Sequence, residues 1–275
     1  MNVEQQVENN YTHGALEEAI LDALRKAGKD IGKLTTADLG GFDQFHLGWH
    51  PATVEFAKHL HLHSGMKLLD VGSGIGGPAR YFAEAFDCEV HGIDLGREFV
   101  DVATSISRRV GLSEMVTFQQ ASATQMPVAG RSFDRATMMH VGMNIADKRK
   151  VFDEVRRALK PDGLFGVYDA MRVGEGNLPY PLPWAMSAET SFVERPADYR
   201  RYLEGAGFVI ESESDRGDFA RMLAREMREK IEREGPPLLG AHTLMGETAS
   251  VRLGNVMSML QAGVISPVEI IARAA

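Results

Sequence analysis

The sequence contains very little cysteine, since Cys88 is the one thiol in 275 residues. A lone cysteine excludes a disulfide framework and a cysteine metal cluster. Histidines at metal-ligand spacing occur without a supporting acid nearby, so nothing replaces the missing thiols as a ligand set. We therefore expect a protein without a resident metal.

Long apolar runs and an excess of basic residues are also missing. No run approaches the roughly 18 residues that cross a bilayer. Lys and Arg total 30 against 38 Asp and Glu, the net charge is -8, and basic residues form no stripe with interleaved aromatics. These features argue against membrane and nucleic-acid partners. The polar N-terminal residues do not resemble a secretory or transit peptide, so we expect a cytoplasmic protein.

Glycine is concentrated in one stretch, residues 67–80. Residues 67–71 form a short apolar run typical of a buried parallel strand, and four glycines follow within six residues. Pro78 then suits the first turn of a helix, where its missing N–H costs nothing. A strand, a glycine turn and a helix in this order bring backbone N–H groups and a helix N-terminus to the carboxyl edge of a sheet. The stretch predicts a polar ligand at this turn.

The neighbouring acids narrow the choice of ligand. Gly72, Gly74 and Gly77 satisfy G-x-G-x-x-G, which alone is a weak dinucleotide signal. Asp70 would oppose a pyrophosphate, and Asp94 ends the next strand at the distance from the glycines where a carboxylate reaches ribose hydroxyls. S-adenosylmethionine, with a ribose, a sulfonium and an ammonium group, fits both acids. A nicotinamide-dependent oxidoreductase, a cofactor-binding protein without catalysis and a purely helix-capping Asp70 remain alternatives.

The remaining pattern alternates strands and helices, which favours a parallel sheet with right-handed crossovers. Two segments interrupt it. Residues 38–50 are rich in aromatics, histidine and glycine, and residues 173–195 are rich in glycine and proline. We expect strands at residues 67–71, 89–94, 115–119, 132–139, 164–168, 208–214 and 263–272, and helices at residues 15–27, 53–61, 79–86, 97–111, 147–159, 196–205, 219–233 and 244–260.

Four motifs give the chain a resemblance to the class I S-adenosylmethionine-dependent methyltransferases. They are Leu-Asp-Val-Gly-Ser-Gly-Ile-Gly-Gly at 69–77, Gly-Ile-Asp-Leu at 92–95, Ser-Phe-Asp at 132–134 and Leu-Lys-Pro-Asp-Gly at 159–163. Residues 43–46, 140–145 and 180–184 further resemble the sarcosine/dimethylglycine methyltransferase-like branch, near the ubiquinone/menaquinone and tocopherol methyltransferases.

The resemblance implies a fold and a domain division. The expected fold is α/β and Rossmann-like, with a seven-stranded, mostly parallel sheet, helices on both faces and a small helical or loop lid. Residues 1–62 would form the N-terminal part of the lid. Residues 63–275 would form the S-adenosylmethionine-binding domain, with a lid insertion near residues 173–195.

The resemblance also assigns cofactor-binding residues. Ser122 stands where such families usually carry an acid that accepts a hydrogen bond from the adenine amino group, and a hydroxyl accepts this bond more weakly. Thr124 or Gln125 would compensate. The expected cofactor contacts are Asp70 through water, Gly72, Ser73 and Gly74 at the methionine moiety, Asp94 at the ribose, Leu95 at the adenine, Ser122, Ala123, and His140 beside the methyl group.

Methyl transfer from a sulfonium is an in-line displacement that needs alignment and exclusion of water more than covalent help. His140 and His46 are the candidates for a base or an orienting group, and each has an alternative structural role. The expected acceptor contacts are Phe45, His46, Asn144, Tyr180 and Trp184, with Arg172, Arg195 or Arg200 as a clamp for an acceptor carboxylate.

The expected partner is a small-molecule methyl acceptor. We expect an amine nitrogen of the sarcosine or dimethylglycine type, with a carbon or oxygen of a quinone-like or specialised metabolite as the alternative. The oligomeric state, including a homodimer, stays open.

Overall fold

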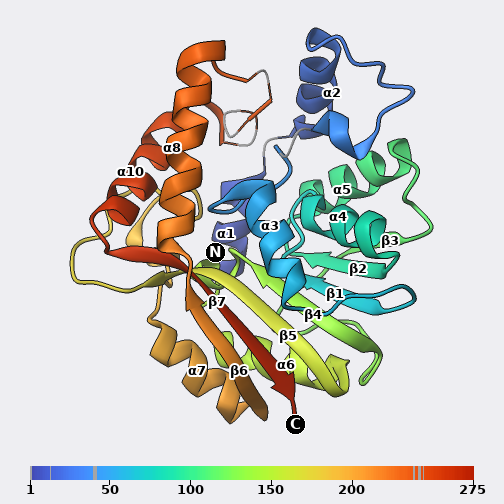
Figure 1. The fold of residues 1–275 in the computed structure, drawn as a ribbon, viewed down its shortest axis with the longest axis vertical. Coiled ribbons are helices and arrows are strands. Elements are labelled where there is room, and N and C mark those ends of the chain that lie inside the picture. The colour runs from blue at the N-terminus through green and yellow to red at the C-terminus, as the bar shows by residue number, and fades with distance from the viewer. Residues whose placement is uncertain (1, 13, 40–41, 238, 241–242, 244) are drawn as a thin grey trace.

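The computed structural model describes residues 2–12, 14–39, 42–237, 239–240, 243 and 245–275. Its centre is a seven-stranded sheet in the order β3-β2-β1-β4-β5-β7-β6 (Figure 1). All seven expected strands are present, so the predicted fold class is confirmed. The strands are β1 Lys67–Val71, β2 Glu89–Asp94, β3 Val116–Gln120, β4 Phe133–Met139, β5 Leu159–Arg172, β6 Phe208–Asp215 and β7 Ile265–Ala274.

The sheet is parallel from β3 through β5 and antiparallel at the β7 and β6 edge. Strand β5 extends beyond the predicted residues 164–168 at both ends, because Leu159 pairs with Phe133 of β4 and β7 pairs as far as Arg172 opposite Ile265. Parallel strands bring their carboxyl ends to one edge of the sheet. The turns that follow β1, β2 and β4 therefore meet at that edge.

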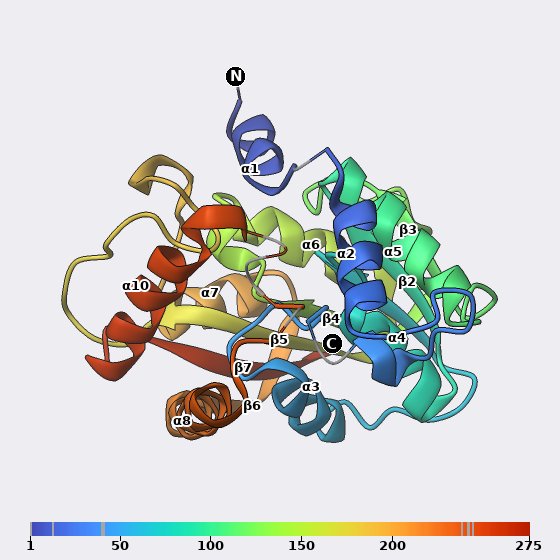
Figure 2. The same ribbon diagram turned by 90° about the horizontal axis from the view of Figure 1, so that it is seen from above.

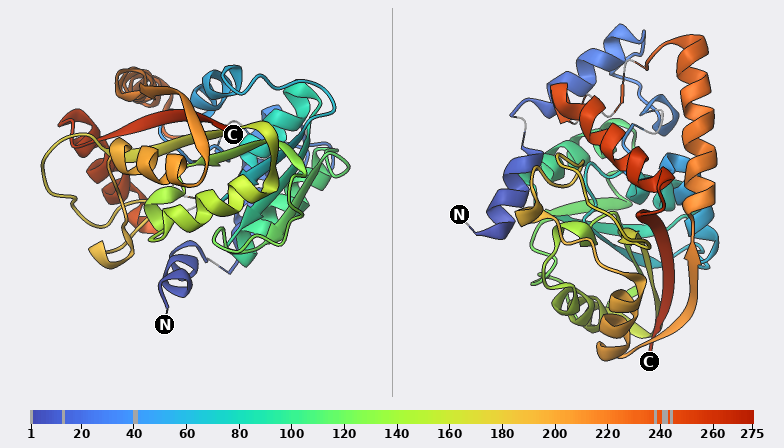
Figure 3. Two further views of the ribbon diagram at one scale, coloured as in Figure 1. Left: turned by 90° about the horizontal axis from the view of Figure 1, so that it is seen from below. Right: turned by 90° about the vertical axis from the view of Figure 1, so that its left-hand side faces the viewer.

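Helices cover both faces of the sheet (Figure 3, left). Phe56 of α3 and Phe82 of α4 pack on one face, and Phe152 of α6 with Tyr199 of α7 on the other. Burial of each such side chain contributes roughly 1.5–3 kcal/mol to stability. The helices are α1 Val3–Tyr11, α2 Leu16–Lys26, α3 Trp49–Lys58, α4 Gly77–Phe86, α5 Arg97–Arg109, α6 Lys148–Ala158, α7 Pro196–Gly205, α8 Gly217–Glu234 and α10 Ala249–Gln261.

Helix α3 begins at Trp49, before the predicted start at residue 53. Gly48 precedes it with φ of 92°, a left-handed conformation that glycine adopts without a steric penalty. Pro51 lies in the first turn, where a missing N–H is tolerated. The expected loop at residues 38–50 therefore ends at Gly48, and its residues 40 and 41 lie outside the described part of the chain.

Helices α2, α8 and α10 stand at the carboxyl end of the parallel strands (Figure 3, right). Seen from above, α10 and α2 lie on opposite sides of the molecule with α1 between them (Figure 2). Residues 173–195 contain a short 3-10 turn, Ala188–Thr190, and an isolated bridge between Leu182 and Ala185, and are otherwise irregular. Within the described residues, no helix is both long and apolar enough to cross a membrane.

Candidate active site

The turn after β1 is held by backbone hydrogen bonds to β2. The N–H groups of Gly72 and Ser73 both donate to the carbonyl of Ile93, at 2.8 and 2.9 Å. Gly72 has φ of +72°, and a Cβ there would lie 2.3 Å from a methyl group of Val141. Glycine is therefore required at this position, both by the backbone conformation and by the close approach of Val141, which follows β4.

A buried ion pair links this turn to the loop before α3. Arg80 of α4 is 1% exposed and donates both to Asp43, at 2.8 Å, and to the carbonyl of Ile75, at 2.8 Å. A Cβ on Gly77 would lie 2.2 Å from the carbonyl oxygen of Asp43. Removing one partner of a buried pair strands the other charge. Arg80 therefore fixes where residues 43–47 lie relative to the glycine turn.

Asp94 lies at the end of β2 and connects two turns. Its Oδ2 accepts from the Gly74 N–H and its Oδ1 from the Gly96 N–H, both at 2.8 Å. Burial raises the pKa of this carboxyl, while the hydrogen bonds from Gly96 and Gly74 oppose that rise. Each carboxylate oxygen can accept further hydrogen bonds. The side chain is thus fixed by backbone donors and retains acceptor capacity for a ligand diol.

Two buried polar atoms beside the turn have no hydrogen-bond partner among the described residues. They are Oδ2 of Asp70 and Oγ of Ser73. The other oxygen of Asp70 accepts from Thr137 at 2.7 Å, and burial raises the pKa of Asp70 to about 7. Unpaired buried polar atoms are costly in a folded protein. Their position beside the glycine turn suits a ligand that brings its own donors.

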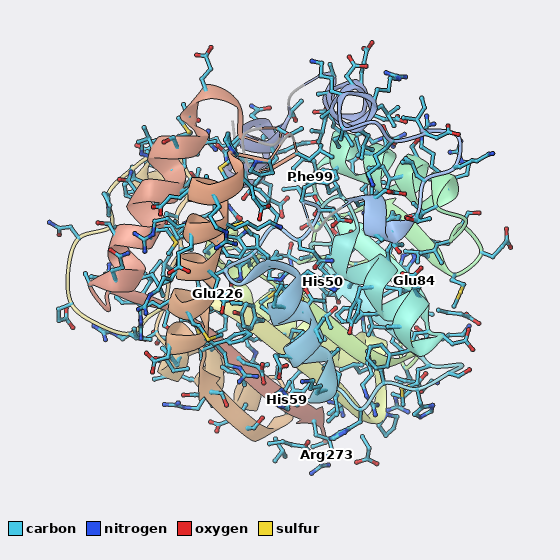
Figure 4. All side chains as sticks on the ribbon, turned by 45° about the horizontal axis from the view of Figure 1, so that its top comes forward. His50, His59, Glu84, Phe99, Glu226 and Arg273 are labelled. Carbon is cyan, nitrogen blue, oxygen red and sulfur yellow. The ribbon has the colours of Figure 1, made fainter. Side chains whose placement is uncertain are left out.

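A cavity of about 400 Å³ opens at this edge of the sheet. Phe99, which lines it, lies near the top of Figure 4, far from Arg273 at the other end of the strands. The cavity brings together most of the residues expected from the sequence. These are Phe45, His46, Gly72, Ser73, Gly74, Asp94, Leu95, Ser122, Ala123, His140, Asn144 and Trp184, and Thr124 joins them.

Three expected residues do not line the cavity: Asp70, Tyr180 and Gln125, the alternative to Thr124. Asp70 is 2% exposed and lies beneath the glycine turn, where β1 pairs with β4. Tyr180 packs instead against an apolar cluster that includes Leu182 and Val256. The expectation that Tyr180 contacts the acceptor is not supported by this placement, because its ring is used to hold the insertion against α10.

The three candidate clamp arginines are also elsewhere. Arg172 donates to the carbonyl of Gly176, while Arg195 pairs with Glu175 and Arg200 with Glu213. None of the described residues that line the cavity is a lysine or an arginine. The described residues also contain no group of three His, Cys, Asp or Glu side chains suited to a metal ion.

His140 follows β4 with φ of 56°, which is unusual for a residue with a side chain. Its Nε2 lies 3.2 Å from the Leu47 N–H, which donates to it, and its Nδ1 lies 3.2 Å from the Tyr168 carbonyl. Burial lowers the pKa of His140 to about 3, so the ring is neutral. Both nitrogens are thus engaged by the backbone, which favours an orienting role over proton transfer.

His46 keeps one ring nitrogen free of these contacts. Its Nε2 lies 2.9 Å from the Trp49 carbonyl and 3.0 Å from the Thr53 hydroxyl, and that hydroxyl itself donates to Gln44 at 2.6 Å. These acceptors require the proton on Nε2, which leaves the lone pair on Nδ1. Burial lowers the pKa of His46 to about 4, so this lone pair is available at neutral pH.

Two helices contribute lining residues that were not predicted from the sequence. Tyr11 of α1 donates to Asn144 at 3.0 Å and lines the cavity. From α10 and the residues before it come Met245, Leu253, Val256 and Met257. The apolar spacing of these helices predicts a packed face, but it does not say what the face covers.

The sheet order, the glycine turn after β1 and the carboxylate at the end of β2 are the features expected of a class I methyltransferase. Residues 69–167 match the family model described as "Methyltransferase domain". The chain therefore contains a class I methyltransferase domain, the type that uses S-adenosylmethionine, and this prediction is confirmed.

Curated relatives of the chain differ in acceptor. It is 35% identical to phosphoethanolamine N-methyltransferase 1 of Arabidopsis thaliana over 191 residues, 66% of this chain and 36% of that protein. It is 36% identical to a sterol 24-C-methyltransferase of Aspergillus fumigatus over 113 residues, 41% of this chain and 30% of that protein. The chain thus spans about a third of the length of these relatives. One relative is named for an amine and the other for a carbon atom.

Solved structures share the fold at low identity. A sarcosine dimethylglycine methyltransferase-type protein from Galdieria sulphuraria has a TM-score of 0.66 at 20% identity, over 82% of this chain and 85% of that chain. The [4+2]-cyclase SpnF has a TM-score of 0.70 at 23% identity, over 98% and 96%. The same fold therefore occurs in proteins named for different reactions.

Proposed function

We propose that this protein transfers a methyl group from S-adenosylmethionine to a small, largely apolar acceptor. The proposal rests on one observation: a single cavity has a polar end formed by the glycine turn and Asp94, and an apolar end without a basic residue among the described lining. This arrangement favours a carbon or oxygen acceptor in a larger metabolite over the amine of a small amino acid, which would need a clamp for its carboxylate.

The polar end suits the cofactor. Asp94 would hold the ribose hydroxyls, the unpaired Oγ of Ser73 would receive a donor from the methionine moiety, and the unpaired oxygen of Asp70 beneath the turn would be reached through water. A buried ligand that pairs such atoms recovers the cost of leaving them unpaired. The bound cofactor supplies an electrophilic methyl group on a sulfonium. A dinucleotide suits the site less well, because its pyrophosphate would approach the charge of Asp70.

The apolar end suits an acceptor without strong charge. Met143 and Trp184 are 2% and 3% exposed and face the cavity together with Val256 of α10. Trp184 is fixed at both ends, because its indole N–H donates to Ser191 at 3.0 Å and its carbonyl accepts from Asn144 at 2.7 Å. Rigid apolar walls align the acceptor and exclude water, which is the main requirement of an in-line displacement.

The two histidines have different tasks in this proposal. His140 fixes the residues around the methyl group through Leu47 and Tyr168. His46 presents the Nδ1 lone pair and would take a proton from an acceptor hydroxyl, or orient one that needs no proton removed. We further propose that α10 belongs to the lid together with residues 1–62 and the insertion at 173–195.

The test uses the purified full chain with S-adenosylmethionine and two sets of acceptors. One set contains phenols, quinols and prenylated alcohols, and the other contains sarcosine, dimethylglycine and phosphoethanolamine. We expect calorimetric binding of S-adenosylmethionine and release of S-adenosylhomocysteine with the first set. Turnover confined to the amines would overturn the acceptor class. Failure to bind the sulfonium nucleoside, with nicotinamide fluorescence changing on mixing, would overturn the function.

A further inference from the structure

Helix α1 presents one face to the cavity. Val3, Glu4, Val7, Glu8 and Tyr11 all line it. Their spacing of three and four residues places them on one side of a helix. The helix starts at a capping box, in which Asn2 and Gln5 exchange side-chain to backbone hydrogen bonds at 2.9 and 3.2 Å. The face of α1 along the cavity therefore combines apolar residues with two carboxylates, with Val7 buried and Val3 and Glu4 exposed.

Both carboxylates contact the ends of the central strands. Glu4 accepts a hydrogen bond from the Ser122 hydroxyl at 2.5 Å, and Glu8 accepts one from the Gln120 amide at 3.3 Å. The same amide donates to the Leu95 carbonyl at 3.1 Å. Glu4 and Glu8 thus reach the side of the cavity where Asp94 and Leu95 lie, rather than its apolar end.

The contact between Glu4 and Ser122 supplies a negative charge that the end of β3 itself lacks. Ser122 occupies the position after β3 where the family resemblance implies an acid, and its hydroxyl points its proton at Glu4. The negative charge missing at Ser122 is therefore present a single hydrogen bond away, on a helix more than 100 residues earlier in the chain. With Asp94 and Glu8 it forms an acceptor-rich wall, and the unpaired Oγ of Ser73 lines the same cavity.

An acceptor-rich wall with no lysine or arginine among the described lining residues favours ligands that donate hydrogen bonds. The exocyclic amino group of adenine can donate two hydrogen bonds. The Ser122 hydroxyl can hold a carboxylate in place while that carboxylate accepts a hydrogen bond from the amino group. A carboxylate accepts such a bond more strongly than a hydroxyl does.

We propose that Glu4 of α1 is the acceptor for the adenine amino group, with Ser122 as its positioning partner. The inference rests on the proposed cofactor and adds a consequence to it. The adenine then contacts both the sheet and α1, so cofactor binding and docking of α1 over the cavity stabilise each other. The N-terminal helix acts as a lid that recognises the cofactor base.

The experiment compares S-adenosylhomocysteine with S-inosylhomocysteine, in which a carbonyl replaces the adenine amino group. Calorimetry on the full chain should give at least a tenfold preference for the adenosine ligand. Glu4→Ala should reduce that preference to threefold or less by weakening S-adenosylhomocysteine alone. In the double variant Glu4→Ala with Ser122→Asp, an acid on the sheet should restore it. Glu18→Ala, on the exposed surface of α2, is the matched control and should change neither affinity.

Amide hydrogen exchange provides a second measurement, which would not distinguish the two ligands if Glu4 had a purely structural role. S-adenosylhomocysteine should slow exchange in α1 of the wild type, whereas S-inosylhomocysteine should do so less. Equal loss of both ligands in Glu4→Ala, or an unchanged preference, would overturn the assignment of Glu4 while leaving the proposed function intact. If the wild type binds neither ligand, the proposed function itself fails, and the assignment fails with it.

Discussion

The two ends of the cavity are constructed in different ways. The cofactor end comes mainly from residues 72–122, and backbone N–H groups and carboxylates define it. The acceptor end comes from residues far apart in the chain, Tyr11 and residues at 45–49, 143–147, 183–184 and 245–257, and apolar side chains define most of it. A site made from backbone depends on which residues permit the turn, while a site made from side chains depends on their size and polarity. Substitutions at the two ends should therefore separate cofactor binding from acceptor choice.

The largest effect is expected from Gly72→Ala at the cofactor end. The added Cβ would combine a left-handed backbone, worth about 1–2 kcal/mol, with overlap against Val141 at 2.3 Å. We expect loss of detectable S-adenosylhomocysteine binding by calorimetry and a lowered melting temperature. Gly65→Ala is the control, because its φ is +79° with open space around a Cβ. Gly65→Ala should be destabilised only by the cost of a left-handed backbone conformation, and its cofactor affinity should not change. Normal binding by Gly72→Ala would contradict this account of the turn.

Asp94→Ala should have the next largest effect at the same end. It removes the acceptor for the ribose and for the Gly74 and Gly96 N–H groups. Unpaired buried donors cost about 1–3 kcal/mol, which corresponds to roughly fivefold to 150-fold weaker binding of S-adenosylhomocysteine. Glu89→Ala, at the exposed start of the same strand, should bind like the wild type. Calorimetric affinity unchanged by Asp94→Ala would remove Asp94 from the site.

At the acceptor end, Met257→Glu should change acceptor use without changing cofactor affinity. The substitution places a charge on the apolar wall, and losing the burial of one such side chain costs about 1.5–3 kcal/mol. We expect the KM for an apolar acceptor to rise about tenfold or more, with the Kd of S-adenosylhomocysteine within twofold. Val251→Glu on the same helix is 55% exposed and does not line the cavity, so it should leave both constants unchanged. Equal behaviour of the two variants would place the acceptor elsewhere.

The smallest effect is a pH dependence of cofactor binding that comes from Asp70. Burial raises the pKa of this carboxyl to about 7, so it is mostly protonated at pH 6 and mostly ionised at pH 8. A nearby cation favours the ionised form, so affinity for S-adenosylmethionine should increase through this range by about threefold to tenfold, equivalent to roughly 1 kcal/mol. S-adenosylhomocysteine, which lacks the sulfonium charge, should respond less. Asp70→Asn should flatten the profile, and a wild-type affinity independent of pH would show that Asp70 does not sense the ligand.

Much of the fold was predictable from the chain alone. Residues 67–78 contain an apolar run, then glycines, then Pro78, and each of these residue types favours a particular backbone conformation at its own position. The strand, turn and helix were therefore predictable without knowledge of the rest of the molecule. The start of α3 was missed because Gly48 sets it by a left-handed turn, and the length of β5 because β7 sets it from the far end of the chain.

The candidate site divides in a similar way. Asp94 was found because its distance from the glycines is fixed by one strand–helix–strand unit. Tyr180 was misplaced because a loop's sequence does not say which side of it packs against α10. The role of Arg80 was also missed, since an arginine inside an amphipathic helix usually faces solvent, and its partners Asp43 and Ser107 lie on segments far from it in the chain.

The sequence by itself determined the cofactor end of this protein: a sheet edge with a glycine turn, a carboxylate after the second strand, and the class of domain to which they belong. It could do so because local backbone preferences act over a few residues and parallel crossovers have one hand. Only the tertiary structure decided the acceptor end. The contact of Tyr11 with Asn144, for example, joins residues more than 100 positions apart. Such pairs form because packing of the whole chain brings them together, and no local pattern encodes which face meets which.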